Sequence, residues 1–132
     1  MEENRTPTPR ESAILKFLWE QGPSSVRDVH RLMLADENVG KELAYNTVQT
    51  LLRIMEDKGL VAHQVDGRTF IYTARFSRDE SARRFLNRVF DGAASQLMLS
   101  LLRSESVSSQ ELEQLQAMID DARRERQTRE GQ

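Results

Sequence analysis

Apolar residues recur three and four positions apart in five segments of the chain, and a sixth segment, residues 93–102, is apolar nearly throughout. This spacing places side chains on one side of a helix, so the pattern predicts six helices, most of them amphipathic. The five stripes are Ala13, Ile14, Phe17 and Leu18; Val26, Val29, Leu32 and Met33; Val48, Leu51, Leu52 and Met55; Ala82, Phe85, Leu86, Val89 and Phe90; and Leu112, Leu115, Met118, Ile119 and Ala122.

Four of these helices have a recognisable start. A serine or threonine followed three residues later by an acid predicts reciprocal hydrogen bonds across the first turn of a helix. The pairs are Thr8 and Glu11, Ser25 and Asp28, Ser77 and Glu80, and Ser108 and Glu111. Glycines at 22, 59 and 92 predict where three of the helices end. The highly charged tail from Arg123 is expected to fray.

One stretch after Gly59 changes to a β pattern. Residues 60–65 and 68–73 are rich in β-prone side chains and flank Asp66-Gly67, a pair that is typical of a two-residue hairpin turn. This turn would place Val65 opposite Arg68 and His63 opposite Phe70. Neither face of the predicted hairpin is wholly apolar, so the sequence leaves open which face packs inward.

The helix predicted over residues 45–57 has an unusual outward side. Opposite its apolar stripe it presents amides, hydroxyls, a phenol and a guanidinium, with no acid between Glu42 and Glu56. Such groups can bind base edges and phosphates in a DNA major groove. The short helix before it, joined through a polar connection that contains Gly40, completes a helix-turn-helix order. The predicted DNA-facing residues are Tyr45, Asn46, Thr47, Gln49, Thr50 and Arg53. An ordinary surface helix is the alternative.

Arg68 stands beside the predicted hairpin tip, where a cation could reach a phosphate or a narrow minor groove. The alternative is a solvated turn arginine.

The last three helices carry more apolar surface than so short a segment can bury by itself. An exposed apolar surface indicates a partner, and a second copy of the chain is the simplest one. Packing onto the N-terminal helices is the alternative. The predicted dimer interface comprises Phe85, Val89, Leu97, Leu101, Leu112, Leu115 and Ile119.

Composition narrows the possible functions of the 132-residue chain. A net charge of −2 argues against a non-specific nucleic-acid coat protein, and 6% aromatic residues are too few for a single-strand stacking surface. There is no cysteine, and the two histidines, His30 and His63, fall on different predicted elements. We therefore expect no metal, no cofactor and no catalytic residue. The chain has neither a membrane-spanning run nor an apolar N-terminal segment, which predicts a cytoplasmic protein.

These motifs together resemble the penicillinase-repressor family, which includes the methicillin-resistance and copper-transport repressors. The resemblance is carried by residues 43–52 (LAYNTVQTLL), by Lys58-Gly59-Leu60-Val61, by Gly67-Arg68 and by Tyr72, with supporting matches in the first two helices. It implies a mainly α protein: a winged helix-turn-helix DNA-binding domain over residues 1–76 and a helical dimerisation domain with a charged tail over residues 77–132. It also implies a homodimer that binds a palindromic operator and represses transcription.

Two departures from the family pattern bear on function. Ile54-Met55 stands where many members have Arg-Leu, so one backbone contact differs. Family repressors are cut at an Asn-Phe bond in the dimerisation domain, and Ser100-Leu101 occupies the matching place here. The resemblance makes this bond the candidate cleavage site and a membrane sensor protease a candidate partner. Copper sensing is not expected, since its cysteines are absent.

Two alternative functions keep the same fold. A winged helix can serve as a protein-interaction module, but the absence of acids between Leu43 and Met55 disfavours this function. A small-molecule-sensing regulator would need a pocket in the C-terminal half, whose short helices suit pairing better.

Overall fold

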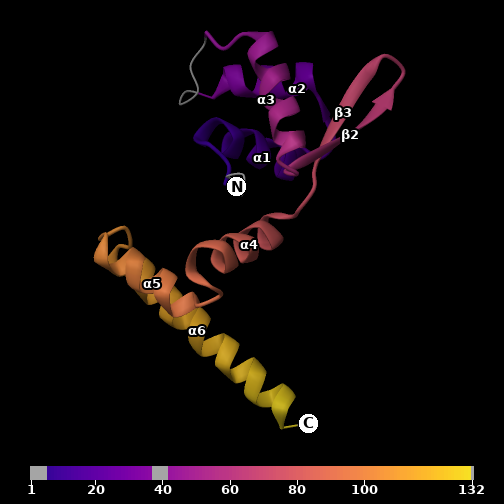
Figure 1. The fold of residues 1–132 in the computed structure, drawn as a ribbon. Coiled ribbons are helices and arrows are strands. Elements are labelled where there is room, and N and C mark those ends of the chain that lie inside the picture. The colour runs from indigo at the N-terminus through magenta and orange to yellow at the C-terminus, as the bar shows by residue number, and fades with distance from the viewer. Residues whose placement is uncertain (1–5, 37–41, 132) are drawn as a thin grey trace. The chain divides into compact units, whose positions relative to one another are not determined.

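The structure is a computed structural model that describes residues 6–36 and 42–131. Within these residues the elements follow the order α1 (Pro9–Gln21), β1 (Ser24–Ser25), α2 (Val26–Ala35), α3 (Tyr45–Asp57), β2 (Val61–Asp66), β3 (Thr69–Ala74), α4 (Arg78–Phe90), α5 (Ala94–Arg103) and α6 (Ser109–Glu130) (Figure 1). The predicted fold class, mainly helical with a hairpin wing, is confirmed. The predicted connection through Gly40 lies outside the described residues.

The chain divides into two compact units, residues 1–85 and 86–132. This division falls within α4. The functional boundary expected between residues 76 and 77 stays a prediction.

The capping predictions are confirmed at the starts of α1 and α2. Thr8 and Glu11 form a full capping box at α1, and Ser25 and Asp28 form one at α2. Ser77 and Glu80 exchange the same pair of hydrogen bonds before α4, each at 3.0 Å. Each pair satisfies backbone N–H groups that a helix start leaves without a partner inside the helix.

The sheet has three antiparallel strands in the order β1-β3-β2. β1 consists of two serines and has no strand signal of its own; it forms because Ser24 and Ser25 lie opposite Tyr72 and Ile71. No pattern in the sequence predicted this strand. On the hairpin, Val61 and Tyr72 are buried, so their face of the sheet packs inward.

The predicted register of the hairpin is wrong. Asp66 pairs with Thr69 and Val65 with Phe70, so the two-residue turn is Gly67-Arg68 rather than Asp66-Gly67. Gly67 has a φ of 65°, and Arg68 has no positive φ. These are the φ signs of a type II′ turn, which favours glycine at its first central position. Arg68 therefore lies in the turn itself.

The core of the first unit gathers residues from α1, α2, α3, β2 and β3, with Leu43 from the chain before α3. It comprises Ile14, Leu15, Leu18, Val26, Val29, Met33, Leu43, Val48, Leu52, Met55, Val61 and Tyr72. The stripes predicted for the first three helices supply most of these side chains. Trp19 packs at the margin of the core, and its Nε1 donates to the Phe76 carbonyl at 2.9 Å.

A buried ion pair joins the start of α1 to the residue that ends α3. Glu11 is only 1% exposed, and Lys58 Nζ donates to its two carboxylate oxygens at 2.8 and 3.1 Å. Glu11 also accepts the Thr8 backbone N–H at 2.9 Å. A charge taken out of water needs such partners, so the pair fixes where α3 ends relative to α1.

The helices α4, α5 and α6 contain no buried residue among those described. The expectation that the tail frays from Arg123 is wrong, since α6 continues to Glu130. Arg124 pairs with Asp121 one turn earlier, and Thr128 Oγ1 donates to the Arg124 carbonyl at 3.0 Å. Opposite charges one turn apart stabilise a helix that has little apolar surface to bury.

We expect Lys58→Met to lower the free energy of unfolding by roughly 2–3 kcal/mol, because it leaves the Glu11 carboxylate buried without its cation. The value is below that of a fully enclosed pair because Lys58 retains some exposure to water. Urea unfolding measures it, with Lys16→Met on the exposed side of α1 as the control. Equal stability of the two variants would contradict this role of the pair.

Candidate nucleic-acid interface

The two sides of α3 differ sharply in burial. Val48, Leu52 and Met55 are fully buried, and this fixes the rotation of the helix about its axis. The opposite side holds the predicted DNA-facing set: Tyr45, Asn46, Gln49, Thr50 and Arg53 are exposed, and Thr47 is half-buried. The structure therefore gathers the predicted residues on one surface. Ile54, which departs from the family pattern, is exposed beside them.

The start of α3 is held from α2. Ala44, the residue that precedes the helix, provides no capping hydrogen bond from its side chain. His30 of α2 lies with its Nε2 2.8 Å from the Leu43 carbonyl oxygen, and the His30 and Tyr45 rings meet edge to face with centroids 5.7 Å apart. The chain entering α3 is thus positioned by His30, a side chain for which the sequence predicted no role.

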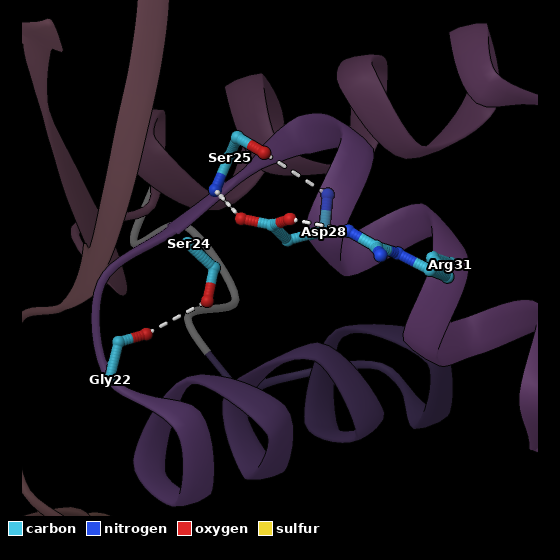
Figure 2. Close-up of polar contacts among 5 residues, drawn as sticks. All are labelled: Gly22, Ser24, Ser25, Asp28 and Arg31. Atoms are coloured by element: carbon cyan, nitrogen blue, oxygen red, sulfur yellow. Dashed lines mark hydrogen bonds and ion pairs between the residues drawn. The ribbon is translucent and has the colours of Figure 1, made fainter.

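The first turn of α2 is fixed by a local network (Figure 2). Ser25 and Asp28 exchange hydrogen bonds of 3.1 Å between side chain and backbone, and Arg31 donates to the Asp28 carboxylate at 2.8 Å. The hydrogen bonds from Ser25, with the charge of Arg31, hold the pKa of Asp28 below its ordinary value. Asp28 is therefore ionised at neutral pH, and the charge of Arg31 is matched by it.

The C-terminal half of α3 is tied to the wing, the hairpin of β2 and β3 that projects beside it in Figure 1. His63 Nδ1 lies 2.7 and 2.8 Å from the two carboxylate oxygens of Glu56. The His63 ring stacks on Phe70, with centroids 4.1 Å apart. Burial raises the pKa of the nearby Tyr72 phenol; Glu56 raises it further and Arg53 lowers it. The wing thus has a defined position relative to α3.

A groove of about 560 Å³ lies between the start of α2, the exposed side of α3 and the wing. Its lining residues are Ser25, Val26, Arg27, Tyr45, Gln49, Arg53, Arg68, Thr69, Phe70 and Tyr72. Four of the predicted residues are among them: Tyr45, Gln49, Arg53 and Arg68. Arg27 was not predicted, because in the sequence it is only one residue of a capping motif.

Other kinds of site are not found in the part of the chain that the structure describes. No group of three or more histidine, aspartate or glutamate side chains there could hold a metal ion. None of the helices described is long and apolar enough to pass through a lipid bilayer.

The residues predicted for pairing lie on α4, α5 and α6. Phe85, Val89, Leu112 and Ile119 are exposed. Leu97, Leu101 and Leu115 are half-buried. The predicted cleavage bond, Ser100-Leu101, lies inside α5.

Comparison with known proteins gives the family. The sequence model of the penicillinase repressor family matches residues 7–121. The chain belongs to the penicillinase repressor family.

Members of this family and related proteins resemble the chain over different lengths. The penicillinase repressor of Bacillus licheniformis is 23% identical over 115 residues, which cover 84% of this chain and 87% of that protein. The methicillin resistance regulatory protein MecI of Staphylococcus aureus (strain N315) is 20% identical, covering 80% and 86%. The transcriptional regulator BlaI of Mycobacterium tuberculosis is 37% identical over 71 residues, covering 53% and 49%. A solution structure of the DNA-binding domain of the repressor BlaI aligns with a TM-score of 0.49 at 21% identity, covering 61% of this chain and 93% of that one.

Membership in the penicillinase repressor family establishes the general function. The protein is a DNA-binding transcriptional repressor and not an enzyme.

We expect Thr50→Glu to weaken DNA binding at least tenfold, because it places a carboxylate on the exposed side of α3 between Tyr45 and Ile54, which contains no acid and where phosphates and base acceptors would approach. Thr50 is exposed, so the free energy of unfolding should change by no more than about 0.5 kcal/mol. Titration of labelled duplex DNA measures the effect. Gln21→Glu, which adds the same charge at an exposed position of α1, is the control. Equal binding by the two variants would remove α3 from the interface.

Proposed function

We propose that this repressor acts as a homodimer on a palindromic operator, with α3 of each subunit in the major groove and the wing on the adjacent backbone. The observation that carries the proposal is the exposed side of α3 from Tyr45 to Ile54, which contains no acid and stands beside a wing with Arg68 at its turn. Asparagine and glutamine can pair with adenine and arginine with guanine, so this surface contains the groups that read base edges. The proposed contacts are Tyr45, Asn46, Thr47, Gln49, Thr50, Arg53 and Arg68.

Pairing through the C-terminal helices is the second part of the proposal. Large apolar side chains on α6 stay open to water, with Leu112 40% and Ile119 49% exposed. Apolar side chains that recur along one side of a helix gain free energy when a partner covers them. The proposed interface is the predicted set Phe85, Val89, Leu97, Leu101, Leu112, Leu115 and Ile119.

Dimerisation matters for selectivity. One winged-helix domain, here called a head, makes few base contacts. Two heads that are held together in a dimer bind two half-sites in a single event. Because operator affinity then depends on assembly, anything that weakens the dimer releases the DNA.

Cutting at Ser100-Leu101 is the release route that we propose, with a membrane sensor protease as the agent. This bond lies within the hydrogen-bonded turns of α5, so cleavage requires α5 to open locally first. Separation of α5 into two pieces would disrupt the apolar surface to which Leu97 and Leu101 belong.

Selection of duplexes from a random-sequence library, followed by footprinting, tests the operator proposal. We expect the selected duplexes to contain inverted repeats, with half-site centres about one or two helical turns apart. Selection of single, unpaired sites would contradict binding as a symmetric dimer. Failure to select any sequence would contradict sequence-specific recognition by α3.

We expect Leu112→Asp to give monomers and to weaken binding to a two-half-site duplex more than to one half-site, because it places a charge in the proposed interface. Analytical ultracentrifugation measures the association state. Gln114→Asp is the matched control, since Gln114 lies on the opposite side of α6 from Leu112 and Ile119. Dimers that persist in Leu112→Asp would show that the interface lies elsewhere.

A further inference from the structure

Three arginines from three different elements line the groove beside α3. Arg27 comes from the first turn of α2, Arg53 from α3 and Arg68 from the turn of the wing. No carboxylate is among the residues that line the groove. The three are far apart in sequence, so the fold and not a local motif brings them together.

These three guanidinium groups have no ion-pair partner in residues 6–36 and 42–131. Arg31, one turn further along α2, differs because it is paired with Asp28 at 2.8 Å. Positively charged groups that line one groove repel one another, and an anion bound between them offsets this repulsion. Guanidinium groups bind phosphate through two parallel hydrogen bonds, which makes a phosphate the anion that suits this groove.

The walls of the groove indicate whether this phosphate belongs to a small molecule or to DNA. The volume alone, about 560 Å³, is also that of a small-molecule site. However, two of its walls are α3 and the wing, the elements proposed to contact the duplex. A phosphodiester strand passing between these elements would run along a lining to which all three arginines contribute.

The exposed side of α3 has two rows of side chains, and only one of them lines the groove. Tyr45, Gln49 and Arg53 are four residues apart and line it. Asn46 and Thr50 are also four residues apart and exposed, but they are not among the lining residues. With a strand held in the groove, the second row would be the one left to face the base edges.

We propose that Arg27, Arg53 and Arg68 clamp the sugar–phosphate backbone of one DNA strand. Arg27 becomes a DNA-binding residue on this assignment, and base reading falls mainly to Asn46 and Thr50. The inference rests on the proposed function, since it requires DNA at α3 and the wing. Backbone contacts fix the register of a protein on the duplex without carrying sequence information themselves.

The test compares the salt dependence of DNA affinity for full-length variants. Each is titrated against a selected duplex and against an unrelated duplex of equal length, between about 50 and 200 mM salt. We expect Arg27→Gln to reduce the slope of log affinity against log salt by about 0.9 for each bound head, on both duplexes. The affinity lost across this salt range then shrinks roughly threefold per head. Arg27→Lys should keep the wild-type slope.

Two control variants are needed. One shows the effect of losing a positive charge outside the groove, and the other shows the effect of losing a base contact. Arg31→Gln removes the same charge from the same helix, outside the groove, and should retain the wild-type slope. Asn46→Ala should reduce the preference for the selected duplex and leave the slope unchanged.

Three outcomes would overturn the clamp. In the first, the salt slope of Arg27→Gln equals that of Arg31→Gln while the wild type still prefers the selected duplex. The proposed function then survives without the clamp. In the second, Arg27→Gln weakens only the selected duplex, and Arg27 reads a base. In the third, the wild type shows neither preference nor salt dependence, and the proposed function fails together with the clamp.

Discussion

Burial of one side of α3 is the constraint on which the rest of the structure depends. Val48, Leu52 and Met55 have no exposure to water, so turning the helix about its axis would uncover them and bury polar groups instead. Removing one such side chain from its packing costs roughly 2–5 kcal/mol, a large part of the stability of a small domain. The core therefore determines which side chains of α3 remain outside. Between Tyr45 and Ile54 that side contains no acid.

The contacts around α3 hold this surface in place at both ends. At its start, His30 meets the Leu43 carbonyl and the Tyr45 ring. At its end, Lys58 reaches the buried carboxylate of Glu11, and Glu56 holds His63 of the wing. These contacts place the wing and the start of α2 at fixed positions relative to α3. A groove lined by arginines from all three elements follows from that arrangement.

Local signals in the sequence predicted local structure well. The capping boxes at Thr8 and Ser25, and the helices that follow them, are present as predicted. The register of the hairpin was wrong because its turn places Gly67 first, where a positive φ is required, and the dipeptide rule cannot distinguish this from a turn that begins one residue earlier. β1 was missed because two serines form a strand only through pairing with β3.

Only part of the candidate site could be predicted, because spacing in the sequence shows which residues share a helix but not which segments pack together. The exposed residues of α3 share one helix, so their spacing predicts a common surface. The groove depends on packing between segments that are distant in sequence, and no spacing rule places Arg27 beside Arg68. The apolar stripes of α5 and α6 are visible in the sequence, but the partner that covers them is not.

Oxidative footprinting of exposed side chains, with and without duplex DNA, tests the central claim most directly. Tyr45 on α3 and Phe70 on the wing are exposed, so we expect both to react readily in the free protein. We expect DNA to protect both, while Trp19 on α1 keeps its labelling. Unchanged labelling of Tyr45 and Phe70 at saturating DNA, or protection at Trp19 alone, would show that a different surface binds the duplex.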